Sequence, residues 1–598
     1  MTEDDKIKSI GLSRRHLLAS SAIASAGLLR FTAGRSIAGL IALTGSSMPV
    51  QAQGSTETIT MVTGRDHLEI YPLPADIIIE KDVMLTMTDG TRIACNIYRP
   101  QTPGPYPVIC AFTVYGKDLH PRYYAIEGRA EIFRAVGLDF GDIRVSDHTP
   151  FEAPDPGYWV PQGYIVMHVD GRGSGNSEGE LNAVGPATIR DYADIITWSS
   201  QQIWSSGRVA MVGVSYLAVV QWAVAALQPE GLAAMIPWEG FSDPYRDLFF
   251  HGGIPETGFV DWWIRGDQSN SAPGNDGPIN FNSTRRAPPT RAFPPRVNLS
   301  AITVPALICA SWSAQGIHSR GCFVAYEEIS STEKWLYTHG RHEWTVSHSL
   351  EALDYQRAFL DRYLKMQADA MADVAPVHLE TRLTREDYRS RKERAWPPSD
   401  TQFVPYHLDA ANLSLSTEKP ANDSEASYAS TEGEALDFKV TFERDTEITG
   451  PIALYLSAAT DSGKEMDIFV GIRKFNAADE EELFYNFLYR NEIASRGWLR
   501  ASHRSLDEQR SHPWRPWLAF DEVRPVIPGE RMDLAIEILP NSILFEAGSS
   551  LILTVRGQDI VENRNSQHKE LMNAGRHIIY TGGDKESYLL LPVQIKNA

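Results

Sequence analysis

The chain has 598 residues, a length typical of two or three domains, and its 43% hydrophobic and 22% charged residues are ordinary for a soluble globular protein. Its formal net charge of −20 argues against a nucleic acid partner, because the phosphate backbone repels an acidic surface. The four cysteines have no spacing typical of a metal site. Three of them lie in apolar, strand-like runs, which favours buried free thiols and leaves a disulfide open.

Residues 1–52 have the character of an export signal. Ser13-Arg14-Arg15-His16 resembles a twin-arginine motif, and Val50-Gln51-Ala52 offers a cleavage site after an Ala-rich apolar run. Arg30 and Arg35 interrupt that run, so we expect no membrane-spanning helix. The sequence therefore predicts an exported protein, periplasmic or secreted. The alternative is a disordered tail with a chance pair of arginines.

Residues 53–238 predict the first part of a parallel α/β sheet. Two alternating apolar runs flank Asp89-Gly90, which indicates a hairpin. Continuous apolar runs at 107–112 and 164–169 are typical of buried strands, and Ile189 to Gln201 reads as an amphipathic helix. The glycine-rich loop Asp170 to Gly179 lacks the order and the following helix of a nucleotide-binding loop. We expect its Asp170 and Arg172 to make local polar contacts.

The stretch from Arg208 to Ala218 carries the strongest chemical signal. An apolar run from Val209 to Val212 predicts a strand, Gly213-Val-Ser215-Tyr follows, and an Ala- and Val-rich helix begins at Leu217. A strand, a tight turn with Ser at its apex and a helix make up a nucleophile elbow. The usual small residue two positions after the Ser is replaced by Leu217. The alternative is an ordinary turn between a strand and a helix.

The rest of the chain divides by its pattern. Residues 239–300, rich in Gly, Pro, Asn and Arg, predict a cap insertion over the substrate pocket, and 301–370 predict the second part of the α/β core. Residues 371–403, where charge rises, predict a linker. Short alternating runs then recur through 404–598 and predict an all-β domain, which we interpret as a jelly roll.

These features together resemble the family of cocaine esterase, Xaa-Pro dipeptidyl-peptidase and α-amino acid ester hydrolase. The elbow, the preceding Trp204-Ser-Ser-Gly-Arg-Val and the β domain carry the resemblance. Further matches, in chain order, are Tyr115-Gly-Lys, Asp170-Gly-Arg-Gly-Ser-Gly, Ser242-Asp-Pro-Tyr-Arg, Thr449-Gly-Pro, Gly497-Trp-Leu-Arg-Ala and Leu590-Leu-Pro-Val. The resemblance implies an α/β-hydrolase core with a cap insertion, followed by an all-β jelly-roll domain.

The resemblance also implies catalytic roles. Ser215 matches the nucleophile, and the Tyr216 N–H with the Tyr115 hydroxyl matches the oxyanion hole. His342 matches the histidine that takes the serine proton, with His339 as the alternative. We expect Trp238, Phe249 and Trp312 to contact substrate.

The sequence departs from the family at the triad acid. The family pattern Trp-x-Asp reads Trp312-Ser313-Ala314 here, and an alanine cannot orient a histidine. Three explanations stay open. Ala314 is an engineered replacement, or the acid comes from Glu343, Glu239 or Asp243, or efficient catalysis has been lost.

The sequence thus predicts a serine hydrolase that cleaves a carboxylic ester through an acyl-enzyme at Ser215 and is weakened by Ala314. One alternative is amide or peptide cleavage, for which Glu239, Asp243, Glu256 or Asp261 would hold a substrate ammonium. Another is a ligand-binding protein without turnover. We expect a small-molecule ester or amide as the partner, no cofactor and no metal, and the pattern leaves a homo-oligomer open.

Overall fold

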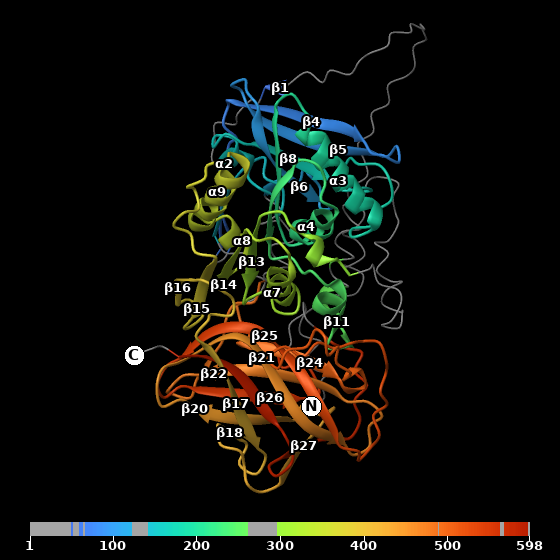
Figure 1. Cartoon of the computed structure of the whole chain (residues 1–598), viewed down its shortest axis with the longest axis vertical. Coiled ribbons are helices and arrows are strands. Elements are labelled where there is room, and N and C mark those ends of the chain that lie inside the picture. Colours follow the sequence, from blue (N-terminus) through green and yellow to red (C-terminus); the bar gives the residue numbers. More distant parts are fainter. Residues whose placement is uncertain are drawn as a thin grey trace, which may run out of the picture. The chain divides into compact units, whose positions relative to one another are not determined.

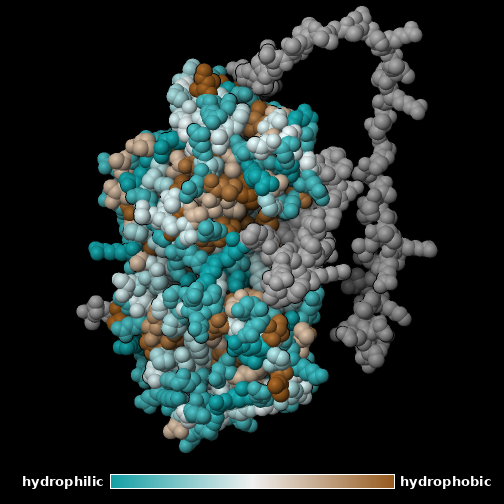
Figure 2. All heavy atoms as spheres, turned by 45° about the vertical axis from the view of Figure 1, so that its right-hand side comes forward, coloured by the Kyte–Doolittle hydropathy of each residue, from teal (hydrophilic) through white to brown (hydrophobic). Residues whose placement is uncertain are grey.

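The computed structural model describes residues 50–51, 59–63, 66–121, 142–260, 263, 296–487, 490–561 and 567–595. The predicted export signal lies almost entirely outside these residues. Within them, no helix combines the length and the apolar character needed to cross a bilayer. Figure 2 shows that hydrophilic residues cover much of the visible described surface, as expected for a strongly acidic chain.

The first half of the chain forms a predominantly parallel sheet with helices on both sides (Figure 1). In spatial order its strands are β4 (Ile77–Thr86), β5 (Arg92–Pro100), β8 (Ile165–Asp170), β6 (Tyr106–Thr113), β9 (Ser205–Val214), β10 (Leu232–Trp238), β13 (Ala306–Ser311), β14 (Lys334–His339) and β15 (Val377–Arg382). From β8 to β15 each pairing is parallel, which brings the carboxyl ends of these strands to one edge. The antiparallel pairing of β4 with β5 confirms the hairpin predicted at Asp89-Gly90.

The central strands are apolar on both faces because helices cover both. Every residue of β8 and of β13 is buried. The helices are α2 (Pro156–Trp159), α3 (Pro186–Ser200), α4 (Tyr216–Leu227), α7 (Ser319–Glu328), α8 (Glu343–Ser347) and α9 (Leu350–Leu364). α3 and α4 pack together on one side, while α9 packs against β9 and β10 from the other (Figure 1). A smaller sheet contains β2 (Ile59–Thr63), β3 (Asp66–Tyr71) and β7 (Asp142–Ser146), and β1 (Val50–Gln51) pairs with β4.

Local details confirm two predictions. All four cysteines are buried and free. In the glycine-rich loop, the Asp170 carboxylate accepts backbone N–H groups from Lys117 and Asn176, and Arg172 forms an ion pair with Asp191. Burial raises the pKa of Asp170 to about 6. Asp170 and Arg172 thus hold the loop by polar contacts within it and with adjacent segments, as predicted.

The region predicted as a cap is described only in part. It contains η4 (Tyr245–Phe249), β11 (Phe250–His251), β12 (Ile254–Pro255) and η5 (Leu299–Ala301), and much of the rest lies outside the described residues. The tight turn between β11 and β12 meets β24 (Ser495–Arg500) of the second half, where the Arg500 N–H donates to the Gly252 carbonyl at 2.9 Å. A Cβ at Gly252 would lie 2.0 Å from the Trp498 carbonyl oxygen, so this contact requires glycine.

The segment predicted as a linker is not a linker. Residues 371–403 contain β15 and β16 (Tyr388–Glu393), and β15 extends the parallel sheet beside β14 while also pairing with β25 of the second half. The buried charged residues of β15 have polar partners. Glu380 forms an ion pair with Arg341, and Arg382 donates a hydrogen bond to the Asn541 side chain. β16 is largely exposed, which explains its polar sequence.

The second half is an all-β domain, as predicted, and its strand pairings are mainly antiparallel. The finer expectation of a jelly-roll topology stays a prediction. Its strands are β17 (Thr401–Asp409), β18 (Ser414–Ser416), β19 (Ser424–Ala429), β20 (Ala435–Thr441), β21 (Thr446–Thr460), β22 (Asp467–Phe475), β23 (Glu481–Glu482), β24, β25 (Met532–Phe545), β26 (Ser550–Arg556), β27 (Arg576–Thr581) and β28 (Tyr588–Gln594), with a short turn of helix, η6 (Ala501–His503). The long strand β21 pairs with β25, β27 and β28 and organises the domain. The apolar side chains of the β domain form a core separate from that of the first half, and this core includes Leu454, Val470 and Leu553.

Candidate active site

Ser215 stands at the junction of β9 and α4, at the carboxyl edge of the sheet. Its backbone has φ 55° and ψ −118°, a conformation that costs a non-glycine residue on the order of 1–3 kcal/mol and persists only where the surroundings enforce it. Gly213 allows the sharp turn, because a Cβ there would lie 2.4 Å from the Leu217 Cβ. The predicted elbow is therefore present as a strained turn between strand and helix.

Hydrogen bonds fix the elbow from both sides. The Ser215 N–H donates to the Trp238 carbonyl at 3.0 Å, and the Val214 N–H donates to the Glu152 carbonyl at 3.1 Å. The Ser215 carbonyl accepts the N–H groups of Ala218 and Val219, which begins the helix. These bonds hold the serine at the N-terminal end of α4, where the helix dipole favours negative charge.

The two residues predicted for the oxyanion hole lie side by side. Tyr216 is the first residue of α4, and its ring meets that of Tyr115 with centroids 6.1 Å apart. The Trp263 indole N–H donates to the Tyr115 hydroxyl oxygen at 3.2 Å. Because that oxygen accepts a bond from Trp263, its own hydrogen is directed to another acceptor. Tyr115 is therefore suited to donate to an oxyanion.

Aromatic side chains that the sequence did not single out surround this pair. Phe151 meets Tyr115 edge-on and also contacts Trp344. On the other side Trp263 lies near both Tyr216 and Phe259. The rings give the surroundings of the predicted oxyanion hole an apolar character. Sequence alone could not group them, since they come from separate loops.

His342 lies at the N-cap position of α8 and is buried. Its Nδ1 lies 3.1 Å from the carbonyl oxygen of Phe487, a residue of the β domain. A carbonyl only accepts, so Nδ1 carries the proton, and in the neutral ring Nε2 is then the accepting nitrogen. This is the tautomer that a general base needs.

The loop that carries Ala314 is bonded to the same groups. The Phe487 N–H donates to the Ser313 carbonyl at 3.1 Å, and the Ser313 hydroxyl donates to the Arg341 carbonyl at 2.7 Å. Phe487 thus joins the loop at the acid position to the loop at the predicted base. Its carbonyl occupies the role of hydrogen-bond acceptor for His342 that a triad carboxylate would take. A backbone carbonyl carries no sequence signal, so sequence reasoning could not find it.

None of the three alternative acids is hydrogen-bonded to His342 among the described contacts. Glu239 lies 2.8 Å from His339 and also accepts the Ser311 hydroxyl. Asp243 forms ion pairs with arginines 246 and 296. Burial, reinforced by the charges of Glu239 and Glu152, raises the pKa of Glu343 well above its usual range.

His339, the alternative base, is engaged elsewhere. It is fully buried, its Nδ1 accepts the Arg341 N–H at 3.3 Å, and its Nε2 faces Glu239. With Cys309, these two side chains place three potential metal-binding atoms within 4.8 Å of one another. The environment does not suit a cation, because a metal on Nε2 needs a proton on Nδ1, which already accepts an N–H. Burial also raises the pKa of the Cys309 thiol well above its usual range, and a metal binds the thiolate.

The hydrogen-bond partner of the Ser215 hydroxyl is a histidine that the sequence did not single out. His318 Nε2 lies 3.0 Å from Ser215 Oγ. The hydrogen bonds of the described residues include none between Ser215 and His342, although catalytic bonds in unliganded enzymes are often long and tighten with substrate. His318 lies four residues after Ala314 in the same loop. Its proximity to Ser215 depends on how that loop folds and has no local sequence signal.

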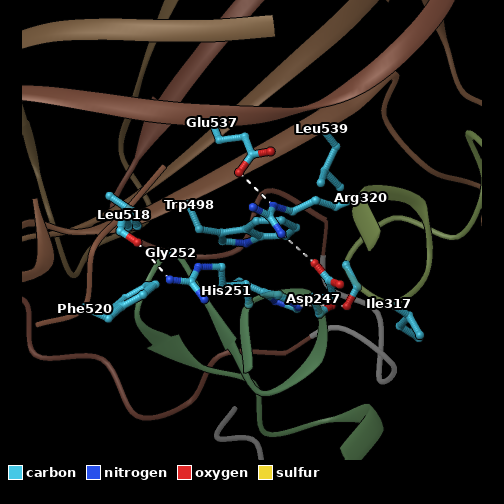
Figure 3. A pocket seen from close by; sticks show the side chains of 12 residues that line it. Asp247, His251, Gly252, Ile317, Arg320, Trp498, Leu518, Phe520, Glu537 and Leu539 are labelled. Atoms are coloured by element: carbon cyan, nitrogen blue, oxygen red, sulfur yellow. Dashed lines mark hydrogen bonds and ion pairs between the residues drawn. The ribbon is translucent and has the colours of Figure 1, made fainter. Parts of the chain in front are cut away.

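The helix that follows His318 is anchored to the β domain. Arg320, in the first turn of α7, forms ion pairs with Asp247 at 2.9 Å and with Glu537 at 2.8 Å, as Figure 3 shows. Its guanidinium also lies over the ring of Trp517, with 4.6 Å to the centroid. The described cavity beside these groups is narrow, about 50 Å³, and is lined by residues of both halves, including His251 and Trp498. We assign it to the contact between the two halves.

The residues predicted to contact substrate lie in packed surroundings. The Trp238 ring packs against Tyr337 and His339, and the Trp312 ring stacks on Phe323 and donates its N–H to the Glu380 carbonyl. Phe249 is also buried. Their role as substrate contacts stays a prediction.

The chain is similar in sequence and structure to several known hydrolases. The model of the X-Pro dipeptidyl-peptidase (S15) family matches residues 89–286, and the model of the X-Pro dipeptidyl-peptidase C-terminal non-catalytic domain matches residues 370–590. A solved CocE/NonD family hydrolase from Staphylococcus aureus is 37% identical, with a TM-score of 0.83 over 87% of this chain and 94% of that one. Cocaine esterase of a Rhodococcus species is 26% identical over 414 residues, 58% of this chain and 67% of that protein. A solved α-amino acid ester hydrolase, 17% identical, shares the fold with a TM-score of 0.61 over 91% of this chain and 100% of that one.

Proposed function

The chain belongs to the CocE/NonD family of hydrolases, related to the S15 peptidases, and we propose that it is a serine hydrolase that cleaves a carboxylic ester through an acyl-enzyme at Ser215. The observation that carries the proposal is the strained backbone of Ser215 at the carboxyl edge of the sheet. Strain of this kind holds the hydroxyl clear of the strand and beside the start of a helix. A serine in an ordinary turn would adopt an unstrained backbone conformation instead.

The reaction uses His342 as the base. Its Nε2 takes the proton of the Ser215 hydroxyl as Oγ forms a bond to the substrate carbonyl carbon. The Tyr216 N–H and the Tyr115 hydroxyl stabilise the oxygen that becomes negative. His342 then gives the proton to the departing alkoxide. In the second half, water gives a proton to His342 as its oxygen bonds to the acyl carbon, the bond from Oγ to that carbon breaks, and His342 returns the proton to Oγ. The Nδ1 bond to the Phe487 carbonyl supports this role, because it sets the required tautomer.

Turnover in this scheme is slow. The Phe487 carbonyl orients His342 but does not carry the negative charge that stabilises an imidazolium. Loss of that charge from a serine triad lowers turnover by about 10⁴. The nucleophile and the oxyanion donors remain, so residual esterase activity is expected.

An ester is favoured over an amide or a peptide. Binding a substrate ammonium needs carboxylates that face it, and the described candidates are already engaged. Glu239 faces His339, and Asp243 pairs with arginines. The Glu256 carboxylate accepts backbone N–H groups of Gly258 and its two following residues. Asp261 lies outside the described residues.

Hydrolysis of p-nitrophenyl acetate and butyrate tests the proposal, with Ser215→Ala as the control. We expect slow hydrolysis by the parent and none above background by Ser215→Ala. Equal rates for the two proteins would remove Ser215 from the reaction and favour the alternative of a ligand-binding protein without turnover.

A further inference from the structure

Two histidines are candidates to act on Ser215, and their hydrogen bonds differ. His342 offers an accepting nitrogen, as described above. His318 lies at the N-cap position of α7, is almost fully buried, and places Nε2 3.0 Å from Ser215 Oγ. Which of the two atoms donates in that contact decides what His318 does.

The hydrogen bond at the second nitrogen of His318, Nδ1, determines which atom donates in the contact between Nε2 and Ser215 Oγ. The Phe241 N–H donates to His318 Nδ1 at 3.2 Å. A backbone N–H cannot accept, so Nδ1 must present its lone pair, and the proton of the neutral ring resides on Nε2. The Phe241 ring stacks on the imidazole, with centroids 5.7 Å apart and planes 13° apart, which holds this orientation. His318 therefore donates to Ser215 Oγ.

The doubly protonated ring does not fit this environment. Burial lowers the pKa of His318 to about 3, and no charged group is among the causes of the shift. A proton on Nδ1 would also oppose the Phe241 N–H at 3.2 Å. His318 is thus neutral at physiological pH, and it cannot take a proton from the serine while keeping its present contacts.

We propose that His318 is a second catalytic histidine that acts as a fixed hydrogen-bond donor to Ser215 Oγ, not as the base. The inference rests on the proposed function of Ser215. By occupying a lone pair of Oγ, the Nε2–H directs the hydroxyl proton away from itself, toward the base. No bond to His318 forms or breaks, and its proton stays on Nε2 throughout.

The donor acts in both halves of the reaction. Oγ becomes more negative as its proton leaves, and Oγ is again negative when it departs from the acyl-enzyme. A hydrogen bond to a charged oxygen is about twice as strong as one to a neutral oxygen, so the Nε2–H bond strengthens where charge develops. In a chain with Ala314 at the acid position, this donor partly offsets the weakened base.

Replacement of His318 by glutamine and by alanine separates donor from base. The amide of His318→Gln presents an N–H near the position of Nε2, whereas His318→Ala presents nothing, and neither accepts a proton as a base would. We expect His318→Gln to keep kcat for p-nitrophenyl acetate within about tenfold of the parent, and His318→Ala to lose about 10²–10³ in kcat with little change in KM. If His318 were the base, both variants would lose activity equally, and this result would overturn the proposal.

A matched control and a direct measurement keep the test independent of folding. His168, also fully buried in the hydrolase half, bonds through Nε2 to the Pro154 carbonyl, and His168→Gln should leave kcat unchanged. Long-range ¹H–¹⁵N spectra of histidine-labelled protein report the tautomer in the parent, even if His318→Ala fails to fold. A proton on Nε2 of His318 supports the proposal, and a proton on Nδ1 refutes it. If the parent itself shows no reaction at Ser215, the proposed function fails first, an outcome distinct from a loss confined to the His318 variants.

Discussion

Restoring a carboxylate at position 314 should raise turnover sharply. Ala314 is fully buried, and its loop is bonded to the same Phe487 segment that accepts the Nδ1–H of His342. An aspartate there competes with the Phe487 carbonyl for that proton and adds the charge that the carbonyl lacks. The gain must exceed the cost of desolvating the new carboxylate, which is several kcal/mol for a buried ion.

The size of the gain follows from the triad. Removing the acid costs about 10⁴ in kcat, and part of the recovery is lost to desolvation and to displacement of the carbonyl. We therefore expect Ala314→Asp to raise kcat by about 10³, equivalent to about 4 kcal/mol in the barrier. Steady-state hydrolysis of p-nitrophenyl acetate and butyrate measures this change.

Ala314→Asn is the matched control. It has nearly the same shape as aspartate and can accept a hydrogen bond, but it carries no charge. We expect it to stay near the parent rate. If Ala314→Asp changes kcat by less than about threefold, position 314 does not hold the acid and the reasoning is refuted. An equal gain in kcat with Ala314→Asn would show that the parent lacks a group that orients His342, not a negative charge beside it.

Three further predictions concern other parts of the molecule. Tyr115→Phe removes one oxyanion donor and should lower kcat by about 10² with little change in KM, and an unchanged kcat would exclude Tyr115 from the site. Arg320→Ala leaves buried Asp247 without its ion-pair partner and should lower the free energy of unfolding in urea by about 3–5 kcal/mol, whereas a loss below 1 kcal/mol would contradict the role assigned to the pair. Burial lowers the pKa of His168 from its ordinary value of 6.5 to about 4, so between these two pH values only the unfolded chain binds this proton, and stability is lost as the pH falls. Between pH 7 and 5 the parent should therefore lose about 2 kcal/mol more than His168→Gln, and parallel pH curves would refute this.

The sequence predicted those parts of the structure that depend on neighbouring residues. The elbow from Arg208 to Ala218 is continuous in the chain, and its strand, turn and helix each have a local pattern. The oxyanion pair came from the family resemblance, which Tyr115 could carry because it follows a recognisable buried strand, and its role stays a prediction. The buried free cysteines followed in the same way from the apolar runs around them.

The rest depends on contacts between distant segments. His318 and Ser215 are 103 residues apart, and no periodicity links them. The Phe487 carbonyl acts through its backbone, so its side-chain type carries no information about it. β15 and β16 were misread as a linker because their charged residues are paired or exposed, which hides the alternation that predicts a strand.

The central claim is that Ser215 is an activated nucleophile, and covalent labelling tests it most directly. The parent chain is treated with a fluorophosphonate and its modified peptide is identified by mass spectrometry, with Ser215→Ala and His342→Ala beside it. We predict a single adduct on Ser215 in the parent, none in Ser215→Ala and much slower labelling in His342→Ala. An unlabelled Ser215 in the folded parent would contradict the account.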